Sequence, residues 1–526
     1  MYKLFIYPNL FGLFIPFSIY VHNSGEVGSE ELIIPLGLIA VVNVATLMIV
    51  RFFCRNPHAF AIFASLLWVV FFQFKNLSIL GAAYGIRTRY WGPFSGLILA
   101  FAAFRVFRLK KDTILSVSNI FFTTSLLMFI YPSILFMRAM ADEVTLSLKS
   151  IDLITSANRG SKDSKKGYDG DIYFIILDGY GGNEVLTKYI QLNNTHFYKM
   201  LEKRGFEISH NSRSNYTATL FSLASTLNMS YLDPLVQVYG EDFRSVAPLK
   251  ESIYNSKVFQ ILKDHKYQIT MITSSSHLNP SRERGLIDQF ITYVKKDQYL
   301  LSIYSQTFLP LIFGDAVFYE FDADGKPWVP QSIQWAFDQG LVFANNKRKD
   351  FVFMHILSPH EPYYFNEHGE IVERYKDERW NDYTGPFEAY RHAYGKNLLG
   401  LNKKIEAFLK QLQRRAPEMP IVILQADHGP PEILDHVLER EGIDEALFRT
   451  SILNAFRLPD HMKGHIQHGM TPVNTFRVIL KGITGHDMEL LENKSYKSSY
   501  KTPFKFRSLE GSRASAVTQN RPMRVT

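Results

Sequence analysis

Two apolar runs in this chain each end in residues that bind hard metal ions. The run from Ile172 to Leu177 is followed by Asp178-Gly, and the run from Ile421 to Leu424 is followed, after Gln-Ala, by Asp427-His428-Gly. Each run is typical of a buried parallel strand, and open α/β sheets place their sites at the carboxyl ends of such strands. Carboxylate oxygens and a neutral imidazole suit Zn²⁺ or Mn²⁺ and leave a position open for a substrate. The sequence therefore predicts a metal site.

A hydroxyl-rich turn lies between these two runs, at Ser214-Asn-Tyr-Thr-Ala-Thr219-Leu-Phe-Ser222, and leads into a predicted helix. A threonine hydroxyl is too weakly acidic to attack at neutral pH unaided, but a divalent cation stabilises the alkoxide. Thr219 stands where the helix begins, and a helix amino terminus also favours an anion beside it. We predict a metal-activated threonine nucleophile, with Thr219 as a fourth metal ligand.

Each of these residues also has an ordinary structural explanation. Asp-Gly, as at Asp178, is a common turn dipeptide, and threonine is a common helix N-cap. Asp427 and His428 are more specific, because two adjacent ligand types at the end of a strand contribute little to packing. The functional interpretation rests on the conjunction of all four residues in this order.

The first part of the chain is dominated by long apolar stretches, whereas charged and apolar segments alternate after about Asp142. Five stretches are long and apolar enough to span, or nearly span, a bilayer. They are Leu4–Val21, Leu32–Val50, Phe60–Phe74, Trp91–Phe107 and Ile114–Phe136. No small-residue cleavage site follows Tyr20, so we interpret the first stretch as a retained helix and not as a signal peptide. Residues 1–138 are predicted to form a membrane domain.

Basic residues predict the orientation of these helices. With a cytoplasmic N-terminus, seven basic residues lie on the inner side and four on the outer side, in agreement with the positive-inside rule. The inner set is Lys3, Arg51, Arg55, Arg105, Arg108, Lys110 and Lys111, and the outer set is Lys75, Arg87, Arg89 and Arg138. Because the number of spans is odd, the large C-terminal part is expected outside.

The formal net charge of +8 could indicate a nucleic-acid partner. Much of the excess lies in the predicted cytoplasmic loops and in the tail after Lys501, so we interpret it as a topology signal with a basic, disordered end, and we predict no nucleic-acid binding. The only cysteine is Cys54, in a predicted cytoplasmic loop. Disulfides, a thiolate metal site and a cysteine nucleophile are therefore excluded from the C-terminal part.

The C-terminal part alternates strand-like and helical patterns. Strands are predicted at Ile172–Leu177, Gln268–Ile272, Phe351–Ile356 and Ile421–Leu424, and helices at Asn183–Lys203, Lys250–His265 and Pro386–Gln413. This alternation predicts an α/β sandwich around a mostly parallel central sheet. We expect a linker at 139–170 after a short amphipathic helix, a catalytic domain at 171–500 and a tail at 501–526.

These residues resemble the sulfatase-like hydrolases and transferases of the alkaline phosphatase superfamily, and most nearly the membrane-anchored phosphoethanolamine and phosphoglycerol transferases, which include the lipoteichoic-acid-synthase-like enzymes. The resemblance covers about Asp171 to Tyr500 and extends to a layout of five spans and an external catalytic domain. It implies an alkaline-phosphatase-like fold and a location in the bacterial cytoplasmic (inner) membrane, with the catalytic domain periplasmic or extracellular. In the phosphoethanolamine transferases a Thr-x-Thr-x-x-Ser run carries the nucleophile on its second threonine, which here selects Thr219 over Thr217.

The resemblance also implies roles for three histidines. The segment from His355 to Tyr363 is similar to a His-x(4)-His-x-Pro stretch whose second histidine contacts the transferred phosphate, which implies that role for His360 and a supporting, substrate-binding one for His355. A further histidine closely follows Asp-His-Gly in the family. The nearest analogue here is His468, about 40 residues on, for which a surface or packing role is the alternative to a substrate or metal role.

The implied function is a metal-dependent phosphotransferase. It would move a phosphoethanolamine-type or phosphoglycerol-type headgroup from a membrane phospholipid, through a phosphothreonine intermediate, onto a cell-surface glycan or glycolipid. Sulfate ester hydrolysis is not expected, because the C/S-x-P-x-R signature that sulfatases need is absent from the sequence. Two alternatives remain open: a membrane-anchored phosphodiesterase or phosphatase with the same site, and an inactive sulfatase-like membrane scaffold.

Overall fold

The chain forms two compact units in this computed structural model, and each is considered by itself. One unit consists of Met1–Leu148 and Lys296–Pro327, and the other of Lys149–Lys295 and Trp328–Thr526. The structure describes residues 3–22, 32–53, 56–83, 90–157, 168–275, 278, 285–293, 298–307, 309, 328–345, 349–372, 387–431 and 435–509.

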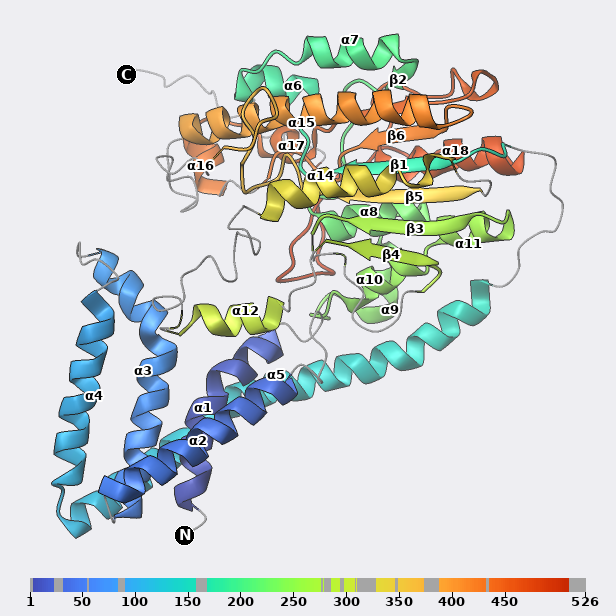
Figure 1. Ribbon diagram of the computed structural model, residues 1–526. Helices are drawn as coiled ribbons and strands as arrows, with labels where there is room; N and C mark the ends of the chain where they lie inside the picture. The colour runs from blue at the N-terminus through green and yellow to red at the C-terminus, as the bar shows by residue number, and fades with distance from the viewer. Residues whose placement is uncertain are drawn as a thin grey trace, which may run out of the picture. The chain divides into compact units, whose positions relative to one another are not determined.

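The first unit is helical, and each of the five apolar stretches forms a helix (Figure 1). The helices are α1 (Lys3–His22), α2 (Ile33–Phe53), α3 (Pro57–Ala83), α4 (Trp91–Phe107), α5 (Lys111–Ala157) and α12 (Gln298–Ser305). Asn43 of α2 donates to Asn9 Oδ1 of α1 at 2.8 Å and accepts from Trp68 Nε1 of α3 at 2.7 Å. Buried side-chain hydrogen bonds of this kind join helices where apolar surroundings offer no other partner.

Two helices in the described residues are long and apolar enough to cross a membrane, Pro57–Asn76 and Lys111–Arg138. Ile33–Thr46 and Pro93–Phe107 are shorter apolar helices, so the count of five spans stays a prediction. All but three of the exposed large apolar side chains in the described residues lie before residue 139; the exceptions are Val342, Ile371 and Tyr500. Burial of such a side chain is worth about 1.5–3 kcal/mol. This distribution is therefore expected of helices that face lipid.

The second unit is built on a seven-stranded sheet in the order β2-β7-β6-β1-β5-β3-β4. The strands are β1 (Ile172–Leu177), β2 (Phe206–Ile208), β3 (Gln268–Thr273), β4 (Gln289–Thr292), β5 (Asp350–Ile356), β6 (Ile421–Gln425) and β7 (Asn454–Arg457). β7 pairs antiparallel with β6 and β2, and the other pairings are parallel. Every residue of β1, β5 and β6 is buried, as expected for parallel strands covered on both faces.

Helices cover both faces of this sheet, each over its own apolar core (Figure 1). One face carries α6 (Asn183–Val185), the π-helix η3 (Leu186–Ile190), α7 (Thr195–Lys203), α14 (Trp328–Gly340), α15 (Phe387–Arg415), α16 (Asp435–Arg440) and α17 (Glu445–Thr450). The other face carries α8 (Thr219–Asn228), α9 (Asp233–Tyr239), α10 (Ala247–Tyr254), α11 (Lys257–Asp264) and α18 (Thr475–Thr484). The short 3₁₀ helices are η5 (Phe343–Asn345), η7 (Asp460–Met462) and η8 (Pro472–Asn474). The predicted α/β architecture with a mostly parallel sheet is confirmed.

Two predicted helices are each broken into pieces. The segment Asn183–Lys203 changes to a π-helix and stops at Gln191, whose φ of 59° lies in the left-handed region. The segment Lys250–His265 contains two helices, because the Ser256 hydroxyl caps the second by accepting from Phe259 N–H at 3.3 Å. The helix predicted at Pro386–Gln413 is confirmed as α15.

Three predicted domain boundaries need correction. Helix α5 continues to Ala157, through the first part of the expected linker, and residues 158–167 lie outside the described part of the chain. The predicted catalytic domain is interrupted, because Lys296–Pro327 belongs to the helical unit. It also extends beyond residue 500: β9 (Arg507–Ser508) pairs with β8 (Tyr496–Lys497), and Phe504 is buried. The remainder of the predicted tail, 510–526, lies outside the described residues.

Candidate metal centre and nucleophile

The carboxyl ends of β1 and β6 meet as predicted. The two strands are neighbours in a parallel register that pairs Ile176 with Gln425, so Asp178 and Asp427, each two residues further on, leave the sheet at the same level. Ligand atoms of Asp178, Asp427 and His428 all lie within 4.8 Å of one another, and the three residues are buried. Buried carboxylates at this spacing would repel each other strongly without a cation between them.

The hydrogen bonds around these side chains leave one oxygen of each carboxylate available to bind a metal. Asp427 Oδ1 accepts from the backbone N–H groups of Gly179 at 3.1 Å and His428 at 3.0 Å. Within the described part of the chain, Asp427 Oδ2 and Asp178 Oδ1 are buried oxygens without a hydrogen-bond partner. Because buried polar atoms normally have partners, these two oxygens fit the ligand positions of a divalent cation.

The His428 ring is also oriented as a metal ligand would be. Its Nδ1 lies 2.8 Å from Gly429 O, and since a carbonyl only accepts, Nδ1 carries the proton. The lone pair is then on Nε2, which lies 3.4 Å from Asp178 Oδ1 and 3.5 Å from Asp427 Oδ2. A histidine held by a backbone carbonyl in this way is typical of metal ligands.

Thr219 joins this group from a different element. It is the first residue of α8, and its Oγ1 lies 3.4 Å from His428 Nε2. The side chain is almost buried, at 7% exposed. Unpaired N–H groups at the helix amino terminus make this an electropositive position for an oxyanion. The structure thus brings together the four residues predicted as metal ligands.

Two of the three predicted histidines lie beside Asp178. The Nε2 atom of His355, on β5, is 3.2 Å from Asp178 Oδ2, and this ring is fully buried. His360 donates its backbone N–H to Asp178 O at 3.0 Å, and its ring centroid is 6.3 Å from that of His428. Burial alone raises the pKa of Asp178, but the neighbouring imidazoles, His360 first and His355 next, outweigh it and hold that pKa well below its ordinary value. The Asp178 carboxyl group is therefore ionised at neutral pH, as the predicted ligand role requires.

His468 stands apart from this group. Its ring is exposed and stacks on His210, with centroids 5.5 Å apart. Among the described residues, the cluster of potential metal ligands at the strand ends consists of Asp178, Asp427 and His428 without it. The stacking on His210 agrees with the surface or packing role that was the predicted alternative for His468.

Sequence reasoning missed a tyrosine that holds the loop after β1. Tyr394 of α15 is fully buried; its hydroxyl accepts from Gly181 N–H and donates to Gly179 O, each at 2.9 Å. Tyr394, which is not a predicted metal ligand, thereby holds the loop that contains Asp178 and donates a hydrogen bond to Asp427. No local pattern marks Tyr394, because it is one of several aromatic residues in a long helix.

Replacing Tyr394 with phenylalanine is expected to weaken Zn²⁺ binding by roughly 10–100-fold, the usual effect of losing a group that orients metal ligands. Tyr173→Phe is the matched control, because that buried hydroxyl also donates one hydrogen bond, to Gly340 O at 3.0 Å, but at the start of β1. Titration with Zn²⁺ and thermal unfolding of both variants check this prediction. Equal Zn²⁺ affinities in the two variants would show that Tyr394 has only a structural role.

The loop before Thr219, the predicted nucleophile, is held by the C-terminal segment, for which no role was predicted. Ser498 N–H donates to Thr217 Oγ1 at 3.1 Å, and Asn215 Nδ2 donates to Lys494 O at 2.8 Å. Ser495 Oγ donates to Ser214 O at 2.7 Å.

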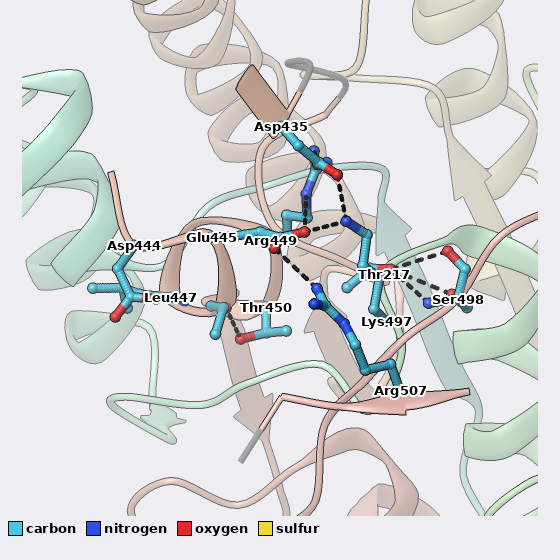
Figure 2. A network of polar contacts seen from close by, with 11 residues as sticks. Thr217, Asp435, Asp444, Glu445, Leu447, Arg449, Thr450, Lys497, Ser498 and Arg507 are labelled. Carbon is cyan, nitrogen blue, oxygen red and sulfur yellow. Dashed lines mark hydrogen bonds and ion pairs between the residues drawn. The ribbon is translucent and has the colours of Figure 1, made fainter. Parts of the chain in front are cut away.

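A charged network fixes this segment in turn (Figure 2). Lys497 and Arg449 each pair with both Asp435 and Glu445. Arg507 pairs with Glu445 as well. Contacts between segments nearly 300 residues apart leave no signal in a local sequence pattern.

Thr217→Val should lower kcat by roughly tenfold with little change in KM, because the part-buried hydrogen bond from Ser498 N–H, worth about 0.5–1.5 kcal/mol, no longer orients the loop that carries the predicted nucleophile. Thr484→Val is the matched control: its hydroxyl donates to Leu480 O at 2.9 Å inside α18. Steady-state kinetics on both variants test the prediction, which fails if the two lose activity equally.

Comparisons with known proteins identify the family of this chain. A family model described as Sulfatase matches residues 172–504, more than half of the chain. The search of curated proteins gave no match.

Similar solved structures include the C-terminal periplasmic domain of EptC from Escherichia coli, at 11% identity, a TM-score of 0.42 and coverage of 66% of this chain and 95% of that one. The corresponding domain of the phosphoethanolamine transferase EptC from Campylobacter jejuni has 14% identity, a TM-score of 0.38 and coverage of 62% and 92%. The lipoteichoic acid synthase LtaP from Listeria monocytogenes has 13% identity, a TM-score of 0.40 and coverage of 64% and 79%. The predicted sulfatase-like family is confirmed by the family model, and the chain belongs to the Sulfatase family.

Proposed function

We propose that this protein is a metal-dependent phosphotransferase that moves a phospholipid-derived headgroup, of the phosphoethanolamine or phosphoglycerol type, onto a cell-surface glycan or glycolipid. The observation that carries the proposal is the Thr219 hydroxyl, 3.4 Å from His428 Nε2 and beside three buried ligand residues. A threonine in this position suits phosphoryl transfer through a covalent intermediate. Members of this family are generally enzymes, either transferases or hydrolases.

Asp178, Thr219, Asp427 and His428 would hold a divalent cation, Zn²⁺ or Mn²⁺. The two buried carboxylate oxygens without hydrogen-bond partners support this assignment, and so does the His428 Nδ1 contact with Gly429 O, which leaves Nε2 to face the cation. When bound, the cation would favour the ionised Thr219 hydroxyl and offset charge on the phosphoryl oxygens.

Each transfer step can be written in terms of the chain's own residues. Thr219 Oγ1 forms a bond to phosphorus while the bond from phosphorus to the diacylglycerol oxygen breaks, and that oxygen takes up a proton. The acceptor hydroxyl oxygen then bonds to phosphorus while the bond from phosphorus to Thr219 Oγ1 breaks. The acceptor hydroxyl releases a proton, and Thr219 Oγ1 takes one up. His360 uses Nδ1 to bond Glu361 O at 2.9 Å, so Nε2 is the nitrogen that would contact a phosphoryl oxygen. His355 would orient Asp178 from behind.

The membrane assignment belongs to the same proposal. A lipid donor requires a site beside a bilayer, and the exposed apolar side chains of the helical unit support that location. We propose a multi-pass protein of the bacterial inner membrane with a cytoplasmic N-terminus and five spans, in which the catalytic unit lies on the outer side. Its partners would be a phospholipid donor and a surface glycan or glycolipid acceptor.

The experiment that tests this function follows the headgroup. The full-length protein is incubated with headgroup-labelled phosphatidylethanolamine or phosphatidylglycerol, with and without a glycolipid acceptor. We expect label on the acceptor, with little free headgroup in its presence. Free headgroup at the same rate regardless of acceptor would identify a phosphodiesterase with the same site. Absence of any release, together with absence of bound metal, would favour the scaffold alternative.

A further inference from the structure

One segment of the C-terminal part of the sequence does not belong to the catalytic unit. The chain leaves that unit after Lys295 and returns at Trp328, and the intervening segment belongs to the helical unit. Its described portion contains α12. The two units are therefore joined by three covalent connections, at 148–149, 295–296 and 327–328, and not by the linker after α5 alone.

Helix α12 is packed against its unit by specific contacts. Tyr299 is only 2% exposed, lies in one apolar cluster with Tyr20 and Val21, and donates its hydroxyl to Pro16 O at 3.0 Å. Leu135 and Phe136 of α5 border the same cluster. At the other end of α12, Gln306 O accepts from the backbone N–H of Lys75 in α3, at 3.4 Å.

These contacts fall on one side of the predicted membrane domain. With a cytoplasmic N-terminus, α1, α3 and α5 all run outward, so Pro16 to Val21, Lys75, and Leu135 with Phe136 are three outer ends. The chain that contains α12 leaves and rejoins the catalytic unit, which is expected on that side.

The length and composition of α12 fit the membrane interface. Its eight residues span about 12 Å, far less than the roughly 20 residues that a crossing needs. Its sequence, Gln298-Tyr-Leu-Leu-Ser-Ile-Tyr-Ser305, contains no charged residue and two tyrosines. Tyrosine is enriched at the boundary between lipid and water, because the ring is apolar and the hydroxyl is polar.

We propose that α12 is a second membrane anchor, which binds the catalytic unit to the outer ends of α1, α3 and α5 independently of the connection through α5. Two attachments hold a domain at a surface far more effectively than one, because the second binding event is intramolecular. The further consequence, that the anchor keeps the site supplied with lipid-borne donor, rests on the proposed function.

The test uses the full chain with a specific protease site inserted between Ser161 and Lys166, reconstituted into vesicles of phosphatidylethanolamine and phosphatidylglycerol. After cleavage and a high-salt wash, the C-terminal fragment should sediment with the vesicles. The double variant Tyr299→Asp, Ile303→Asp should release it into the supernatant. The matched control is Val342→Asp with Ile371→Asp, two exposed apolar residues of the catalytic unit, and should behave as the wild type.

Two outcomes would overturn the proposal. One is release of the wild-type fragment into the supernatant, and the other is retention of the Tyr299→Asp, Ile303→Asp fragment on the vesicles. Thermal unfolding and Zn²⁺ binding of the released fragment show that its catalytic unit is folded. A separate assay compares vesicle-borne phospholipid with a dispersed short-chain phospholipid. With vesicle-borne phospholipid, the activity of the cleaved double variant should be roughly tenfold lower than that of the cleaved wild type. With the dispersed phospholipid, the two activities should be equal. If no protein uses either donor, the proposed function fails, while the sedimentation result still decides the role of α12.

Discussion

Thr219→Ala is expected to abolish headgroup transfer while Zn²⁺ remains bound. Removal of a catalytic nucleophile typically costs about 10⁴-fold or more in kcat. Asp178, Asp427 and His428 supply three ligands without the hydroxyl, so the variant should still bind the metal, with reduced affinity. Thr219→Ser keeps a hydroxyl on the first residue of α8 and should retain a substantial part of the activity.

The matched control for this change is Thr226→Ala, at another buried threonine of the same helix. It should leave kcat within a small factor of the wild type. Headgroup release measured under single-turnover conditions, with metal content measured on the same samples, separates loss of the nucleophile from loss of the metal. Wild-type activity in Thr219→Ala, or equal losses in the two variants, would exclude Thr219 as the nucleophile.

Asp427→Asn is expected to weaken Zn²⁺ binding by at least 100-fold, with a parallel loss of activity. The reason lies in the hydrogen bonds of this carboxylate. Because Oδ1 accepts from Gly179 and His428, the amide oxygen of asparagine would take that position, and the NH₂ group would point toward the ligand cluster. A pair of donors would then face the cation where a negatively charged oxygen lies in the wild type.

Chelation should reproduce this loss in the wild type, and added Zn²⁺ or Mn²⁺ should reverse it. The bound metal should also stabilise the folded catalytic unit, by about 4 kcal/mol at a concentration 1,000 times Kd. Asp338→Asn, an exposed aspartate of α14, is the control and should change neither Zn²⁺ affinity nor thermal stability. Full activity after exhaustive chelation would contradict a metal-dependent mechanism.

The sequence predicted the central part of the sheet because β1, β5 and β6 are buried on both faces and read as continuous apolar runs. The meeting of Asp178 with Asp427 and His428 followed from the rule that parallel strands place functional residues at one edge. The short strands β2, β4 and β7 were missed, since three or four residues give no recognisable period and their pairing is decided by tertiary contacts.

Residues that support the site were missed for a related reason. Tyr394 donates to the backbone carbonyl of Gly179, and the backbone N–H of Ser498 donates to the Thr217 hydroxyl. Each contact joins residues more than 200 positions apart, so it does not depend on local periodicity. Helix α12 was assigned to the catalytic domain because its apolar run is too short to predict a membrane span. His468 was considered by analogy with a family motif, and its observed partner is the His210 ring.

The most direct measurement is the mass of the peptide that carries Thr219 after acid quenching during turnover with phospholipid and without acceptor. The proposed mechanism predicts an increment equal to the phosphorylated headgroup of the donor, located on Thr219 and lost when acceptor is added. It would at the same time identify the transferred group. Turnover that proceeds with Thr219 unmodified, or with the increment on another residue, would contradict the phosphothreonine intermediate.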